Sequence, residues 1–122
     1  MKKILFTFLI GLALLSCKQE ARQSEMPITE FSQRDLKKND LLVDVRTPGE
    51  FEAGHLEGAV NIDWMAADFV QKWDTIDRDR KVYVYCKVGG RSAEAAHLLD
   101  SLGYDVIDLT GGWDAYKARQ SP

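Results

Sequence analysis

The chain of 122 residues is long enough for one small domain. Its content of 45% hydrophobic and 29% charged residues is that of a folded protein rather than a disordered one. The formal net charge is −3, and a mildly acidic chain without a basic stripe argues against nucleic acid as a partner.

The N-terminus, residues 1–16, is predicted to be a signal peptide. Two lysines precede an apolar run over 4–15 that is too short to span a bilayer but has the length of a signal-peptide core. The run ends in Ser16-Cys17, which resembles the lipobox of bacterial lipoproteins, although Leu15 is bulkier than the small residue often found there. In that family cleavage precedes the cysteine, which then carries lipid, so the resemblance implies that Cys17 is lipidated.

We therefore expect an exported domain of the cell envelope, held to a bacterial membrane through a lipid anchor. Two alternatives remain: an ordinary secretory signal that leaves Cys17 as a free thiol, and an uncleaved membrane anchor. Removing residues 1–16 deletes two lysines and no acid, so the mature charge would be −3 − 2 = −5. Residues 17–26 are polar and read as a tether between membrane and domain.

Residues 27–120 are predicted to fold as one domain in which strands alternate with helices. The strands are expected at 27–29, 41–45, 58–62, 82–85 and 104–109. The helices are expected at 32–38, 47–53, 66–73, 92–102 and 113–119. The second of them begins with a capping-box pattern, with Thr47 as the N-cap, Pro48 at N1 and Glu50 at N3. This alternation predicts an α/β fold with right-handed crossovers and a mainly parallel sheet, whose ligands bind at the carboxyl ends of the strands.

The stretch from Lys81 to Ser92 carries the chemistry. The strand residues 82–85 are all β-branched or aromatic, which suits a strand covered on both faces. Cys86 follows at once, and Gly89 and Gly90 then allow a tight turn into a helix. A helix N-terminus favours a thiolate, which is the nucleophilic form of cysteine, and also binds anions.

Lys87 and Arg91 add positive charge to the same loop, which points to a small anionic substrate. The competing interpretation is a buried structural cysteine before an ordinary βα turn. If Cys17 is lipidated, Cys86 has no intramolecular partner, and the chain has no C-x-x-C pair for dithiol chemistry.

Three motifs in order resemble a single-domain rhodanese-like sulfurtransferase. The first is Asp44-Val45-Arg46, with Glu50-Phe51 and the run Gly54-His55-Leu56-Glu57-Gly58-Ala59-Val60-Asn61-Ile62. The second is the active-site loop C-x-x-G-x-R, here Tyr85-Cys86-Lys87-Val88-Gly89-Gly90-Arg91-Ser92. The third is Leu109-Thr110-Gly111-Gly112-Trp113. Together they span about residues 27–118.

The resemblance implies a rhodanese-like five-stranded parallel sheet flanked by helices, and a reaction in two halves. Cys86 would take the outer sulfur of a small anionic donor such as thiosulfate, and cyanide, a thiol or a protein cysteine would then accept it. The resemblance assigns the cradle for the persulfide and the donor to the backbone N–H groups of the loop, which are those of Lys87, Val88, Gly89, Gly90, Arg91 and Ser92. It supplies no metal and no organic cofactor.

Other polar residues are interpreted as structural. Asp44 and Arg46 are expected to form a supporting ion pair more often than to touch the site. His55 is expected to bond backbone in a turn rather than to act as a base, and His97 to be solvated. The tryptophans are expected in the core or the wall of a pocket.

Two competing functions remain. A phosphatase or arsenate reductase on the same scaffold resembles C-x-x-x-x-x-R, whereas only four residues separate Cys86 from Arg91, which suits a single sulfur atom better than a tetrahedral phosphate. The second competitor is a module that carries or senses sulfane sulfur without turnover.

Overall fold

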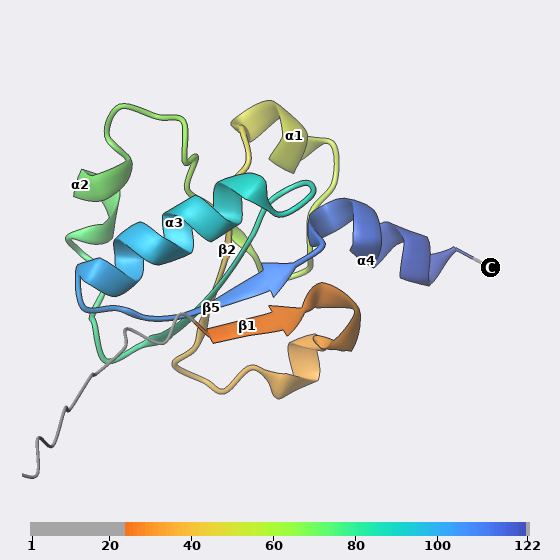
Figure 1. Cartoon of the computed structure of the whole chain (residues 1–122), viewed down its shortest axis with the longest axis horizontal. Coiled ribbons are helices and arrows are strands. Elements are labelled where there is room, and N and C mark those ends of the chain that lie inside the picture. Colours follow the sequence, from red (N-terminus) through yellow and green to blue (C-terminus); the bar gives the residue numbers. More distant parts are fainter. Residues whose placement is uncertain (1–23, 122) are drawn as a thin grey trace, which may run out of the picture.

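The computed structural model describes residues 24–121, which form one parallel sheet flanked by helices (Figure 1). The five strands run in the order β1-β5-β4-β2-β3. Their bounds are β1 Ser24–Pro27, β2 Leu41–Asp44, β3 Val60–Asn61, β4 Lys81–Tyr85 and β5 Asp105–Thr110. All four neighbouring pairs are parallel, so the α/β fold and the five-stranded parallel sheet predicted from the sequence are confirmed.

Helices cover both faces of this sheet. The elements are α1 Pro48–Glu52, α2 Phe69–Trp73, α3 Gly90–Ser101 and α4 Gly112–Gln120, with two short 3₁₀ turns, η1 Ile28–Glu30 and η2 Gln33–Asp35. One hydrophobic cluster joins α2 and α3 to the sheet, and a second joins η1 and α4 to the opposite face. The long helix α3 crosses the sheet in Figure 1, with the glycine-rich loop at its N-terminal end.

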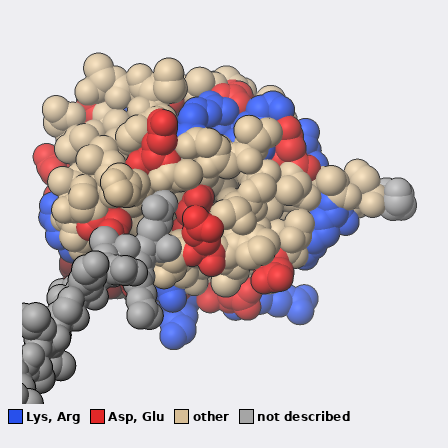
Figure 2. All heavy atoms as spheres, viewed as in Figure 1, with Lys and Arg blue, Asp and Glu red and all other residues tan. Residues whose placement is uncertain are grey.

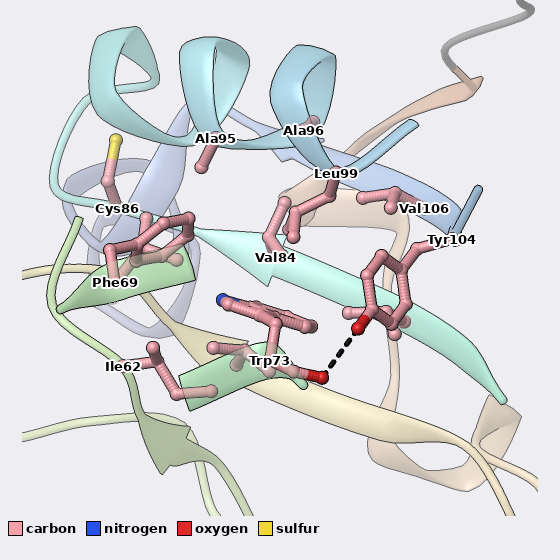
Figure 3. Packing of buried hydrophobic residues seen from close by; sticks show 13 residues of the cluster. Ile62, Phe69, Trp73, Val84, Cys86, Ala95, Ala96, Leu99, Tyr104 and Val106 are labelled. Atoms are coloured by element: carbon pink, nitrogen blue, oxygen red, sulfur yellow. Dashed lines mark hydrogen bonds between the residues drawn. The ribbon is translucent and has the colours of Figure 1, made fainter. Parts of the chain in front are cut away.

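The central strand β4 explains how the two clusters are divided. Val82 and Val84 pack in the cluster under α3, whereas Tyr83 and Tyr85 pack in the cluster under α4. This is the alternation that a strand buried on both faces requires. The next residue, Cys86, falls on the α3 side by the same alternation, and Figure 3 shows it below the first turn of that helix.

The first strand lies earlier than the sequence predicted. Strand β1 occupies Ser24–Pro27 instead of 27–29, so residues 24–26, which had been assigned to the tether, pair with β5. Strand β1 lies at the edge of the sheet and is largely exposed, so it can contain polar residues. These residues gave no hydrophobic pattern from which the sequence could predict a strand. Pro27 ends it, and Ile28 turns into the core as the start of η1.

Several other elements are shorter than predicted. The helix expected over 32–38 is only the 3₁₀ turn η2, because Leu36 is already extended. The strand expected over 58–62 is reduced to β3, and the helix over 66–73 is reduced to α2. In contrast, α3 begins two residues before the predicted Ser92.

No helix within 24–121 is long and apolar enough to cross a membrane. The predicted signal peptide, residues 1–16, and the predicted lipidation site Cys17 lie outside the described residues.

Candidate active site

Cys86 directly follows the last residue of β4 at the carboxyl edge of the sheet. Its side chain is buried, with 1% of its surface exposed, and points toward the first turn of α3 (Figure 3). The backbone N–H of Gly89 donates a hydrogen bond to Cys86 Sγ at 3.0 Å. Gly89 adopts a φ of +121°, a conformation that side-chain-bearing residues avoid, and so glycine lets the loop turn back over the sulfur.

The start of α4 holds the other side of the loop. The N–H of Trp113 donates to the carbonyl of Cys86 at 2.8 Å, and the N–H of Asp114 donates to the carbonyl of Lys87 at 3.0 Å. The approach is so close that a Cβ on Gly112 would lie 2.6 Å from the Cys86 oxygen and 2.5 Å from the Lys87 oxygen. These contacts fix the two loop carbonyls against α4, while the Gly89 N–H of the same loop is directed at the sulfur.

Arg91 is held by a carboxylate from α1. Its guanidinium donates two hydrogen bonds to Glu50, at 2.7 and 3.0 Å. Glu50 is also the N3 residue of the capping box that begins with Thr47, as the sequence predicted. The Arg91 hydrogen bond holds the pKa of Glu50 at about 2, so Glu50 is ionised at neutral pH.

The same arrangement acts on Arg91. Its pKa is raised chiefly by the Glu50 hydrogen bond, with smaller coulombic contributions from Glu50, Cys86 and Asp44. Arg91 therefore stays charged beside the sulfur while it fixes the helical end of the loop to α1.

Lys87 is paired in turn with α4. Its ammonium lies 2.6 Å from an oxygen of Asp114, and both side chains are exposed to solvent. Hydrogen bonding to Lys87 lowers the pKa of Asp114. Each of the two cations expected to attract an anion therefore has its own carboxylate partner.

Ser92, in the first turn of α3, and Asp108, in β5, are both buried. The Ser92 hydroxyl donates to the carbonyl of Gly89 at 3.2 Å, which ties the first turn of α3 to the residue that contacts the sulfur. Burial raises the pKa of Asp108, while a side-chain hydrogen bond with Ser92 lowers it by less. Within the described residues, Oδ1 of Asp108 has no hydrogen-bond partner.

Asp44 and Arg46 form a buried ion pair at 2.6 Å, with 0% and 3% of their side-chain surfaces exposed. Arg46 also donates to the carbonyl of Gly54 at 2.7 Å, and its guanidinium lies 5.2 Å from the ring of Trp113. Burial lowers the pKa of Arg46, but the hydrogen bond and charge of Asp44 outweigh this and raise it. The pair joins β2 to the segment after α1 and to α4, so it acts on the framework of the site rather than on the sulfur.

The remaining candidates have other partners than the sulfur. The ring of His55 stacks on Phe51, and its Nδ1 lies 2.8 Å from the carbonyl of Phe51, which is the turn role expected for it. Trp73 is buried in the core, and Trp64 donates to Glu94 at 3.2 Å. Among residues 24–121, no group of three or more His, Cys, Asp or Glu side chains could hold a metal ion.

Sequence reasoning missed three contributors to the site. Glu50 was assigned to the first motif and to the start of a helix but was not expected to contact the loop, and Asp114 and Gly112 were given no role of their own. Their contacts with the loop join positions that are distant in the sequence, so no local sequence pattern predicts them. The one sequence signal for this contact was the double glycine before Trp113, because glycine permits backbone conformations and close approaches that other residues do not. In the structure Gly112 has a φ of +68°.

Comparisons with known proteins agree with this geometry. The family model of the rhodanese-like domain matches residues 28–119. A sulfurtransferase of Allochromatium vinosum is 34% identical over 101 residues, which cover 81% of this chain and 92% of that protein. The thiosulfate sulfurtransferase PspE of Escherichia coli is 31% identical over 70 residues, which cover 57% of this chain and 67% of that protein.

A solved structure is similar as well. The crystal structure of a rhodanese-related protein from Thermoplasma volcanium superposes with a TM-score of 0.62 at 33% identity, over 70% of this chain and 83% of that one. Other relatives are much longer: the match to the adenylyltransferase and sulfurtransferase UBA4 of Candida albicans spans only 20% of that protein. The fold, the Cys86 loop and the family match agree, and the chain belongs to the rhodanese-like domain family.

Proposed function

We propose that the protein is a sulfurtransferase that moves sulfane sulfur from thiosulfate or a similar donor to a thiophilic acceptor, through a persulfide on Cys86. The observation that carries the proposal is the hydrogen bond from the Gly89 N–H to Cys86 Sγ, at the N-terminal end of α3. Relatives that carry the name sulfurtransferase support the same reaction class.

The proposed half-reactions balance in atoms and charge. The thiolate of Cys86 attacks the outer sulfur of thiosulfate, the S–S bond of the donor breaks, and sulfite leaves with the bonding electron pair. The product is a Cys86 persulfide with one negative charge. In the second half, an acceptor such as cyanide or a thiolate attacks the outer sulfur, and the Cys86 thiolate is regenerated as the leaving group.

The residues of the loop divide this work. The Gly89 N–H stabilises negative charge on the sulfur, and the first turn of α3 offers N–H groups that have no intrahelical acceptor. The contacts of α4 with the carbonyls of Cys86 and Lys87 keep those oxygens away from the developing charge. Because these donors are fixed before the donor binds, they need no reorganisation during the reaction.

Turnover by the full chain tests the proposal. With thiosulfate and cyanide, the wild type is expected to produce thiocyanate, and Cys86→Ser to produce none. Cys17→Ser is the matched control, because it removes the other cysteine and is expected to retain turnover. Hydrolysis of phosphoesters without thiocyanate would instead support the phosphatase alternative.

We also propose that the domain is exported and anchored to the membrane through lipid on Cys17. The support is the sequence pattern of residues 1–17. Metabolic labelling with a radioactive fatty acid is expected to mark the wild type and not Cys17→Ala. Equal labelling of both proteins, or labelling of neither, would contradict the anchor.

A further inference from the structure

The two cations of the Cys86 loop are each paired with an acid from outside the loop. Lys87 lies 2.6 Å from Asp114 of α4, and Arg91 makes two hydrogen bonds to Glu50 of α1. In Figure 2, basic and acidic atoms accordingly lie side by side over the end of the molecule where α1, the loop and α4 meet, rather than as a patch of one sign.

Both acids are ionised at neutral pH. The hydrogen bond from Arg91 holds the pKa of Glu50 at about 2, and the hydrogen bond from Lys87 lowers that of Asp114. The charges of the two cations and the two carboxylates around the sulfur therefore cancel. These two pairs therefore leave no net charge of their own, whereas the N–H groups of the loop and the first turn of α3 can still attract an anion.

This balance distinguishes between sulfur donors. The attacking thiolate carries one negative charge, thiosulfate carries two, and the persulfide of an organic thiol carries one at its reacting end. Without a net positive charge from the loop, approach of the dianion is opposed more strongly than approach of the monoanion.

The loop also presents an apolar contact. Val88 lies between Lys87 and Arg91 in the sequence and is 66% exposed, the second most exposed of the large hydrophobic side chains described. It can pack against the carbon part of an organic persulfide, whereas the sulfonate end of thiosulfate offers it nothing apolar.

We infer that Glu50 and Asp114 are specificity-determining residues, and that the preferred donor is the persulfide of an organic thiol rather than thiosulfate. The inference rests on the proposed function. The step balances as before: the Cys86 thiolate attacks the outer sulfur of R–S–S⁻, the S–S bond breaks, and the thiolate R–S⁻ leaves.

The test compares two donors in the half-reaction that loads Cys86, using the full chain with cysteine persulfide and with thiosulfate. The wild type is expected to have a second-order rate constant of loading at least ~10-fold higher for the persulfide, which corresponds to about 1.4 kcal/mol. Asp114→Asn frees the charge of Lys87, and is expected to raise this rate constant for thiosulfate about threefold and make it fall more steeply with salt. The value for cysteine persulfide is expected to change much less.

The matched control is Asp68→Asn, at the residue that precedes α2. Asp68 is an exposed aspartate paired with Lys72 at 3.7 Å, so this variant makes the same change in net charge without removing a partner of Lys87 or Arg91. It is expected to leave both donors unchanged. Glu50→Gln is the second specificity variant and is expected to shift the ratio in the same direction as Asp114→Asn.

The inference is overturned if the wild type prefers thiosulfate, or if Asp114→Asn changes the two donors by the same factor. Failure of the proposed function looks different, because Cys86 would then accept sulfur from neither donor.

Discussion

The carbonyl of Cys86 accepts a hydrogen bond from the N–H of Trp113 at 2.8 Å, which joins the candidate nucleophile to a residue 27 positions later in the chain. The contact is possible because Gly112, with a φ of +68°, lets the backbone of α4 come against the loop. Two helices therefore hold the conformation of the Cys86 loop: α3, which follows it in the chain, and α4, which packs beside it.

Gly112→Ala is expected to disrupt this contact. The added Cβ would meet the Cys86 and Lys87 carbonyls at 2.6 and 2.5 Å, and alanine disfavours the positive φ. We expect a loss of about 2 kcal/mol or more in the free energy of unfolding, measured in urea, together with slower loading of sulfur on Cys86.

Gly49→Ala is the control for that variant. Gly49 lies in the first turn of α1, where a Cβ would meet nothing within 4 Å. Its unfolding free energy is expected to match or slightly exceed that of the wild type. An equal loss in both variants would show that the effect of Gly112→Ala does not come from its contact with the loop.

Breaking the buried pair of Asp44 and Arg46 is expected to be costly. Arg46→Met leaves the Asp44 carboxylate buried without its cation, and we expect a loss of about 3 kcal/mol in unfolding free energy. The double variant Asp44→Leu with Arg46→Met removes both charges, so it is expected to lose less than the single variant. A double variant that is less stable than Arg46→Met would contradict this account.

The Arg91–Glu50 pair predicts a dependence of stability on acid. The pKa of Glu50 is lowered from 4.5 to about 2 in the folded state, mainly by the Arg91 hydrogen bond. A depressed pKa contributes stability that is complete above pH 4.5 and is lost as the pH falls through about 2. Glu50→Gln should therefore show a flatter decline in urea midpoint over this range than the wild type does.

Asp108 predicts the opposite dependence of stability on pH, because its pKa is raised rather than lowered. Burial raises the pKa of Asp108 above the usual 3.8, so the protonated carboxyl stabilises the folded protein. This contribution to the free energy of unfolding is complete below the unfolded-state pKa and is lost as the pH rises through the folded-state pKa. Asp108→Asn keeps the shape without the charge. We expect it to raise the unfolding free energy by about 1 kcal/mol at neutral pH, with the gain disappearing in acid below the unfolded-state pKa.

Thermal unfolding across pH checks the Asp108 prediction, with Asp77→Asn in an exposed turn as the control. A gain for Asp108→Asn that stays constant in acid would mean that ionisation of Asp108 is not its cause. The same variant should leave sulfur loading within about a factor of a few, because the introduced amide can still bond the Ser92 hydroxyl.

The sequence was most informative where local rules act alone. The run of residues 82–85 predicted a buried central strand, and Thr47, Pro48 and Glu50 predicted the start of α1; both predictions are confirmed. The loop after Cys86 follows from its glycines in the same way.

Contacts between distant segments were beyond such rules. Strand β1 is held by pairing with β5 rather than by burial of hydrophobic side chains, and so its sequence does not show the pattern of a strand. Likewise, the charge of Arg91 was evident, but its compensation by Glu50 depends on how α1 is placed beside the loop. The sequence therefore located the candidate nucleophile, while the pairing of the charges around it could be seen only in the structure.

The most direct test of the account is the mass of the protein after exposure to a sulfane sulfur donor. Wild-type protein treated with thiosulfate or cysteine persulfide and then freed of donor is expected to gain one sulfur atom, which peptide mapping places on Cys86. Subsequent cyanide should remove it, and Cys86→Ser should never acquire it. No gain in mass on wild-type Cys86 with either donor would contradict the central claim.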